Sequence, residues 1–204
     1  MSRDKNEAIN SYISDMLALE DHIEKAIRSQ IEGLKDYPDA VTELRQIHRT
    51  VDHHISDLRA LSERRGAGGA KEAVKRAGSA VLGAAAGIID LVRTEGLPKN
   101  LRDDYTALSL ASIGYVMLHT TGLSLDDREV AELAHQGFRD YAGAVSRVQA
   151  SIPSAVVAFL KQEGLPARED VVPQVRQTIE EVWQDQSSGV FRTDESVVSR
   201  DIPR

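Results

Sequence analysis

The stretch that decides the fold runs from Ile9 to Leu61 and holds two apolar stripes, INSYISDMLALEDHIEKAIRSQIEGL at residues 9–34 and LRQIHRTVDHHISDLRAL at residues 44–61. Apolar side chains recur there at steps of three and four, which is the spacing of one face of an α-helix. The stripes consist of Ile9, Ile13, Met16, Ile23, Ile27 and Leu34, then Leu44, Ile47, Val51, Leu58 and Leu61. We therefore predict two amphipathic helices.

The residues between the two stripes predict a tight turn. Pro38 is expected to end the first helix, and the neighbouring Asp39 is placed to cap the free backbone N–H groups that open the second. A connection this short makes the two helices antiparallel neighbours.

Each stripe is interrupted by one polar residue, Glu20 in the first and His54 in the second. Glu20 precedes Tyr37 in the turn by 37 − 20 = 17 residues, and His54 follows it by 54 − 37 = 17 residues. At about 1.5 Å of rise per residue, both lie about 25 Å from the turn. The spacing predicts that the two side chains face each other in the core.

A buried acid and imidazole are costly unless they pair with each other or bind a metal. One interpretation is a Glu20–His54 ion pair or hydrogen bond that fixes the register of the helices. The other is part of a metal site, although one acid and one histidine fall short of the usual ligand set for two metals. Tyr115 and His119, on a later apolar stripe, are candidates to join this layer through a hydrogen bond.

The composition predicts a soluble α-helical protein. The chain has 204 residues, 41% hydrophobic and 28% charged, with 4% aromatic residues, which favours closely packed helices over a sheet. The net charge of −7 argues against a surface for nucleic acid or an anionic membrane. The absence of cysteine excludes disulfides and thiolate chemistry. The polar start of the sequence shows no secretory signal, so we expect a cytoplasmic protein.

Further helices are predicted after Leu61. A segment rich in small residues, 71–93, is expected to be a buried crossover helix, because its apolar run of residues 77–89 is shorter than the about 20 residues that span a bilayer. Asp103 and Asp104 are placed to cap or charge the start of a fourth helix. A fifth opens at residues 126–127, and a sixth runs from 169 to 184.

The tetrapeptide Glu-Gly-Leu-Pro occurs twice, at residues 95–98 and 163–166. Glycine suits the left-handed position after a helix, and proline prevents the helix from continuing. We interpret both copies as helix stops. From residue 186 the chain is polar, and we predict a disordered tail over 186–204.

Several segments resemble a bacterial ferritin-like family over roughly Asp4 to Gly164. They are Leu101–Leu110 continuing through Gly114–His119, Asp140-Tyr141-Ala142, and Ile152-Pro153. The resemblance implies an all-α, ferritin-like up-down four-helix bundle with a helical crossover. We add a C-terminal accessory helix and divide the chain into a bundle domain at 1–185 and the tail at 186–204.

The resemblance also implies a metal site, with iron or manganese as the metal. Ferritin-like sites draw a glutamate from each of two helices and a Glu-x-x-His pair from each of the other two. Glu20 matches the first-helix glutamate and His54 the second-helix histidine, but Val51 stands where a glutamate is needed. The Glu-x-x-His pair Glu132 and His135 is a second candidate, although it lies one step off the apolar stripe. The implied site is therefore degenerate.

Three functional hypotheses follow, and no catalytic residue is nominated in any of them. The first is a bundle that has lost di-iron chemistry, needs no cofactor, and acts through protein contacts as a homodimer; the resemblance implies a stress or storage setting. A tail segment, residues 195–199, is a further candidate for binding a protein partner. The second hypothesis is a metal-binding protein that uses Glu20 and His54. The third is a carrier of a small apolar ligand beneath the crossover helix.

Overall fold

The computed structural model describes residues 4–34, 37–66 and 96–190 of the chain. These ranges form helices without any strand: α1 (Lys5–Gly33), α2 (Pro38–Arg64), α4 (Leu97–Ser124), α5 (Arg128–Gln162) and α6 (Val171–Val190). The predicted all-α class is confirmed. The predicted crossover helix over residues 71–93 and the tail beyond residue 190 lie outside the described residues. The chain divides between Ile152 and Pro153 into two compact units.

The two apolar stripes of residues 9–61 form the core of the first unit. Every apolar side chain assigned to them is at most 7% exposed, and the two polar interruptions, Glu20 and His54, are buried with them. Burying a large aliphatic side chain stabilises the folded state by about 1.5–3 kcal/mol. The predicted pattern is therefore confirmed for both α1 and α2.

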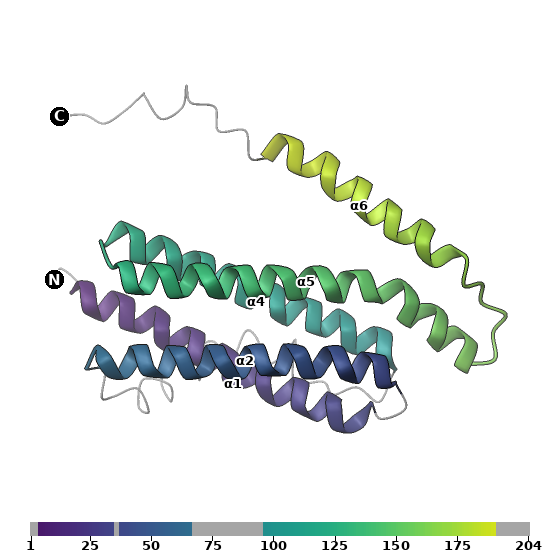
Figure 1. The fold of residues 1–204 in the computed structure, drawn as a ribbon, viewed down its shortest axis with the longest axis horizontal. Helices are drawn as coiled ribbons and strands as arrows, with labels where there is room; N and C mark the ends of the chain where they lie inside the picture. The colour runs from purple at the N-terminus through teal and green to yellow at the C-terminus, as the bar shows by residue number, and fades with distance from the viewer. Residues whose placement is uncertain (1–3, 35–36, 67–95, 191–204) are drawn as a thin grey trace. The chain divides into compact units, whose positions relative to one another are not determined.

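Polar contacts at the two ends of the first unit define the direction of each helix. Near the start of α1, Arg65 donates to Asn6 and Asn10 at 2.9 and 3.1 Å, and to Asp127 before α5 at 2.6 Å. Near the end of α1, Gln30 donates to Asp104 of α4 at 2.7 Å. Helices α2 and α4 therefore both run opposite to α1, as Figure 1 shows for the helices drawn side by side. Gly66 and Gly96 consequently lie at opposite ends of this bundle.

Two expected helix starts are wrong. Pro38 begins α2 rather than ending α1, and Asp39 lies in the first turn of α2 without capping it. Helix α4 begins at Leu97, so Asp103 and Asp104 lie inside it. The physical reason is shared, because proline lacks an N–H and is favoured in the first helical turn, where that donor has no partner within the helix.

The first copy of Glu-Gly-Leu-Pro leads into α4, and the helix that it is predicted to end lies outside the described residues. Gly96 precedes α4 with a φ of 98°, and Pro98 is in the first turn of that helix. Gly164 follows the end of α5 with a φ of 76°, as expected for a helix stop. Asp127 caps α5, since its Oδ1 accepts the Val130 N–H at 3.3 Å. The fifth helix therefore opens where the sequence predicts.

Asp104 has an environment that the sequence does not predict. The side chain is buried, and its Oδ1 accepts the Gln30 amide N–H. Asp104 Oδ2 and Gln30 Oε1 have no hydrogen-bond partner among the described groups. The pKa of Asp104 is raised to about 7, chiefly by burial; the Gln30 hydrogen bond lowers it in part, and the nearby Asp103 adds a smaller increase. A protonated Asp104 would supply the donor that the Gln30 carbonyl lacks.

The second unit contains the end of α5 and helix α6. Lys161 pairs with Glu169 across the turn between these helices, and Arg176 of α6 donates to Ser154 at 2.9 Å. Helix α6 continues to Val190 rather than ending at residue 184. Three of its apolar side chains are exposed: Val175, Val182 and Trp183.

Candidate functional site

Glu20 lies at the centre of a buried polar layer to which α1, α4 and α5 contribute. Its side chain has no exposed surface. Tyr115 of α4 donates its hydroxyl to Glu20 Oε1 at 2.7 Å, and Tyr141 of α5 donates to Oε2. The two tyrosine rings stack with their centroids 5.7 Å apart. Both carboxylate oxygens therefore have a hydroxyl partner.

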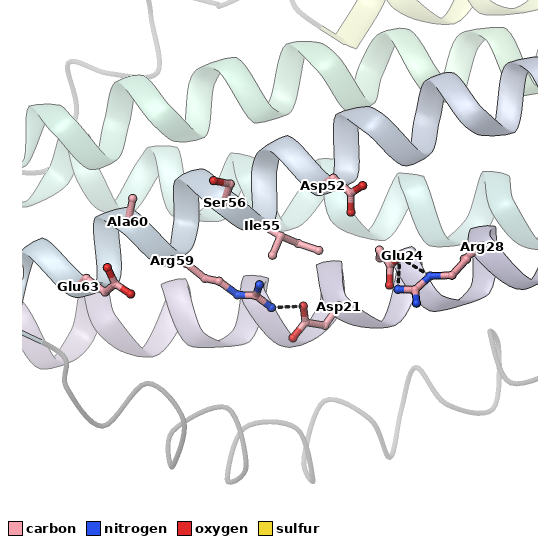
Figure 2. A pocket seen from close by; sticks show the side chains of 9 residues that line it. All are labelled: Asp21, Glu24, Arg28, Asp52, Ile55, Ser56, Arg59, Ala60 and Glu63. Carbon is pink, nitrogen blue, oxygen red and sulfur yellow. Dashed lines mark hydrogen bonds and ion pairs between the residues drawn. The ribbon is translucent and has the colours of Figure 1, made fainter.

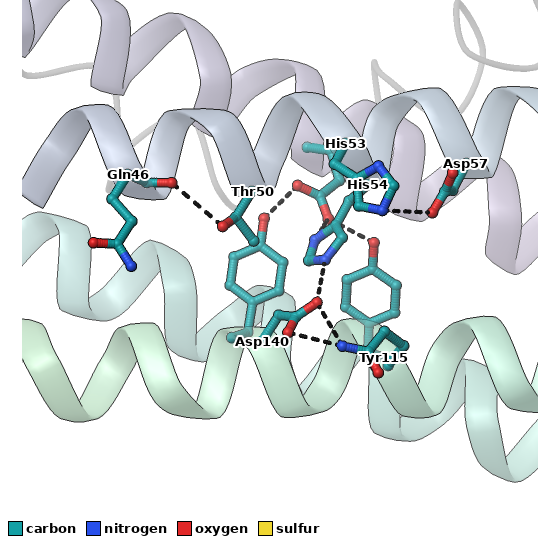
Figure 3. A network of polar contacts seen from close by, with 10 residues as sticks. Gln46, Thr50, His53, His54, Asp57, Tyr115 and Asp140 are labelled. Carbon is teal, nitrogen blue, oxygen red and sulfur yellow. Dashed lines mark hydrogen bonds and ion pairs between the residues drawn. The ribbon is translucent and has the colours of Figure 1, made fainter.

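His54 of α2 completes the layer and connects it to the edge of the bundle. Its Nδ1 lies 3.5 Å from Glu20 Oε1, which is an ion-pair distance, and this nitrogen has no hydrogen-bond partner among the described residues. Its Nε2 lies 3.2 Å from Oδ2 of Asp140, and Gln136 donates to both oxygens of Asp140 at 2.9 and 3.1 Å. Figure 3 shows His54 reaching from α2 toward Asp140 of α5, with Tyr115 beside it.

The charges of the layer favour an imidazolium between two carboxylates. Burial alone would lower the pKa of His54, but Glu20 and Asp140 outweigh it, and the pKa of His54 is raised. The raised pKa stabilises the folded state. This stabilisation is at its full size below about pH 6.5, the pKa of an unfolded histidine, and is lost as pH rises through the higher pKa of His54 in the folded state. Burial, together with Glu20, raises the pKa of both tyrosines far above its usual range. The tyrosines therefore remain neutral donors.

The residues of this layer fit a di-metal centre poorly. Such a centre needs several inward carboxylates and histidines, whereas α4 and α5 present the phenols Tyr115 and Tyr141 to Glu20. A metal ion bound by Glu20 would compete with these hydroxyls for the lone pairs of the carboxylate, and a hydroxyl that the ion displaced would be left buried without an acceptor. That loss costs about 1–3 kcal/mol for each group. Glu20, Tyr115 and Tyr141 therefore form a hydrogen-bonded layer in which both carboxylate oxygens already have a donor.

The expected layer is assembled in part. Glu20, His54 and Tyr115 come together, whereas His119 instead contacts the Ala131 carbonyl oxygen through Nδ1 at 2.7 Å. Sequence reasoning missed the part played by Tyr141 and Asp140. The available signal was Tyr141 itself, a hydroxyl on the apolar stripe of α5 that needs a partner when buried.

The second candidate pair does not join the layer. Glu132 and His135 are both exposed on α5. Arg128 donates to Glu132 at 2.9 Å, one helical turn away, and the His135 ring lies 5.5 Å from the ring of His119. The pair stands at the edge of the helix and not beside Glu20.

The Tyr115 ring packs directly against α5 at Gly137, where there is no side chain in its way. We predict that Gly137→Ala is destabilising. A Cβ at Gly137 would lie 2.5 Å from Tyr115 Cε1, although alanine favours a helix by about 1 kcal/mol over glycine. We expect the clash to dominate, with a net loss of about 1–3 kcal/mol in urea unfolding. Gly143→Ala on the same helix is the matched control, because the one described atom that its Cβ would meet within 4 Å is Arg147 Nη1 at 3.4 Å. Equal stabilisation by both variants would contradict this packing.

A second polar cluster lies between α1 and α2. Glu24, His48 and Asp52 each offer one ligand atom, and these atoms all lie within 4.8 Å of one another. An open pocket of about 580 Å³ adjoins the cluster (Figure 2). The sequence suggests only that His48 and Asp52 pair on an exposed face. Glu24 completes the cluster because α1 and α2 pack together.

Comparison with known proteins gives no relative. No family model matches the chain, and no curated protein or solved structure matches it. The ferritin-like resemblance therefore stays a prediction, and the functional argument rests on the geometry of this chain.

Proposed function

We propose that this protein is a ferritin-like helical bundle without di-iron chemistry, and that it acts through protein contacts made by the outer face of α4 with a second copy of the chain. The observation that carries the proposal is an apolar stripe on that face. Leu110, Ile113 and Met117 are 42%, 58% and 48% exposed, at steps of three and four. Such a stripe is typical of an interaction surface.

The ferritin-like part of the proposal is supported by topology and by the polar layer. Helices α2 and α4 run parallel, so the connection between them must join opposite ends of the bundle, as in ferritin-like bundles with one long crossover. The resemblance assigns Glu20 and His54 to metal binding, but each oxygen of the Glu20 carboxylate accepts a hydrogen bond from a tyrosine hydroxyl. The layer then serves to fix the register of four helices.

A second copy is the partner that the charges of α4 favour. The midpoint of the stripe from Leu110 to Met117 is (110 + 117)/2 = 113.5, so in an antiparallel pair Arg102 faces residue 125 of the other copy. Arg102 is exposed and pairs with Asp103 of its own chain at 2.7 Å, and Asp126 is exposed in the turn after α4. Each basic Arg102 would therefore lie near the acidic turn of the other copy, and the two ends are equivalent, as a two-fold interface requires.

We further propose that the protein is soluble and cytoplasmic. Helix α5 is, by length and composition alone, able to cross a membrane. Its side chains argue for packing in a bundle instead, because Tyr141 belongs to the buried layer and Arg147 pairs with Glu43 of α2 at 2.6 Å. The stress setting, the tail as a docking segment and the ligand-carrier hypothesis stay predictions.

Sedimentation equilibrium of the full chain tests the proposed contact. We expect a dimer, and we expect Ile113→Glu/Met117→Glu to weaken it by at least about 100-fold, because central apolar contacts dominate such interfaces. Arg102→Glu should weaken the dimer less than the double variant does. Arg49→Glu makes the same change of charge at an exposed position of α2 and should leave the dimer unchanged. A wild-type monomer at about 100 μM, or a double variant that still dimerises, would overturn the proposal.

A further inference from the structure

The cluster of Glu24, His48 and Asp52 is arranged like a metal-binding histidine with a carboxylate on each side of its ring. His48 Nε2 faces Glu24 Oε1 at 2.8 Å, and His48 Nδ1 faces Asp52 Oδ2 at 3.1 Å. Metal-bound histidines commonly donate their second ring N–H to a carboxylate, which fixes the tautomer and leaves the other nitrogen free to bind. Here Asp52 is placed to accept a hydrogen bond from the Nδ1–H of His48, and Nε2 faces the carboxylate of Glu24.

The adjoining pocket provides space and negative charge. Its charged lining residues are the acids Asp21, Glu24, Asp52 and Glu63 and the bases Arg28 and Arg59, a balance of 2 − 4 = −2. Figure 2 shows Glu24 and Asp52 facing the same space from opposite helices. The opening gives an ion and its bound waters access to Glu24, whose own side chain is only 9% exposed.

We propose that this cluster is a binding site for a divalent transition-metal ion of the zinc type, with His48 Nε2 and Glu24 as ligands and Asp52 as the residue that orients His48. Imidazole nitrogen and carboxylate oxygen both bind zinc at about 2.0–2.2 Å. A tetrahedral ion separates two such ligand atoms by about 3.3 Å, so the 2.8 Å contact has to open by about 0.5 Å. Water completes the coordination from the pocket.

Arg28 is the cation that now neutralises Glu24. Its guanidinium bonds to Glu24 Oε1, through Nε at 2.7 Å and through Nη2. The Arg28 side chain is 58% exposed and can move into solvent when a metal ion arrives. Binding is therefore a competition between the ion and this arginine.

A metal ion at this position would join α1 to α2. The ligands Glu24 and His48 belong to different helices, and a ligand that binds only the folded state stabilises it according to its concentration and affinity. The expected consequence is a zinc-dependent rise in the unfolding midpoint of the bundle. This inference is independent of the proposed contact through α4.

Isothermal titration of the untagged, chelator-treated full chain with zinc chloride at pH 7.5 tests the proposal. We expect about one zinc ion per chain, and a loss of affinity of about 10–100-fold in Asp52→Asn, the size usual for a supporting residue. His48→Gln should remove the binding. Arg28→Gln should tighten it, because the competing cation is gone.

His53 and Asp57 provide a matched control on the same helix. They repeat the spacing of His48 and Asp52, with His53 Nε2 at 3.4 Å from Asp57 Oδ2, but both are exposed. His53→Gln should therefore leave zinc affinity unchanged within about two-fold. The proposal is overturned if His53→Gln costs as much affinity as His48→Gln, or if neither the wild type nor Arg28→Gln binds a stoichiometric zinc ion.

Discussion

Replacing Glu20 with alanine is expected to lower the free energy of unfolding by about 3–5 kcal/mol, the cost of breaking a buried ionic network by removing one partner. The variant leaves the Tyr115 and Tyr141 hydroxyls without their acceptor and leaves His54 with one carboxylate instead of two. It also leaves a cavity in a layer that has no exposed surface at Glu20. Urea denaturation followed by circular dichroism measures the loss.

Two variants make this result specific. Glu129 pairs with Arg64 at 2.8 Å on an exposed surface, so Glu129→Ala should change stability by at most about 0.5 kcal/mol. The triple variant Glu20→Leu/Tyr115→Phe/Tyr141→Phe removes the donors together with the acceptor and should recover part of the loss, because an apolar layer leaves no buried hydroxyl unpaired. A Glu20→Ala variant as stable as Glu129→Ala would contradict the hydrogen-bonded layer.

Replacing Asp104 with asparagine is expected to remove a pH-dependent loss of stability. Asp104 has a folded pKa of about 7, whereas an unfolded aspartate titrates near about 3.9. Between these values only the folded state holds the proton, so stability falls as pH rises from about 4 to about 7 and then stays level. Each pKa unit corresponds to about 1.4 kcal/mol, which sets the effect on the order of 2–4 kcal/mol.

Asparagine keeps the shape of the pair and replaces the proton with an amide. Its N–H₂ can donate to Gln30 Oε1 while its oxygen still accepts from Gln30 Nε2. At pH 8 we therefore expect Asp104→Asn to be more stable than the wild type, and at pH 5 we expect the difference to shrink toward zero. Asp39→Asn, an exposed aspartate of α2, is the control. A difference between Asp104→Asn and wild type that does not vary with pH would contradict the buried protonated acid.

The sequence predicts the helices and the buried pair better than it predicts the chemistry around the pair. The stripes of α1 and α2 place Glu20 and His54 at one height because a helix has a fixed rise, and a turn of known position sets the register. Tyr115 follows from the same reasoning as a buried phenol in need of a partner. These are local patterns, and local patterns determine which face of a helix is buried.

The parts that sequence reasoning missed depend on contacts between distant segments. Asp104 looks like a helix-start residue, but α4 begins at Leu97 with Pro98 in its first turn, so Asp104 lies in the interior beside Gln30. Glu24 looks like a surface acid until α2 brings His48 to it. Neither contact has a signature in the spacing of its own helix, because each depends on the rotation of one helix against another.

Iron loading is the sharpest test of whether Tyr115 and Tyr141 keep metal from Glu20. The His48→Gln variant, which lacks the proposed zinc-type site, would be purified without chelator or affinity metal, given ferrous iron under air, desalted and analysed for its metal content. We expect no stoichiometric iron in this variant. About one or two iron ions per chain, lost again in Glu20→Gln, would contradict it and make the buried layer a metal centre after all.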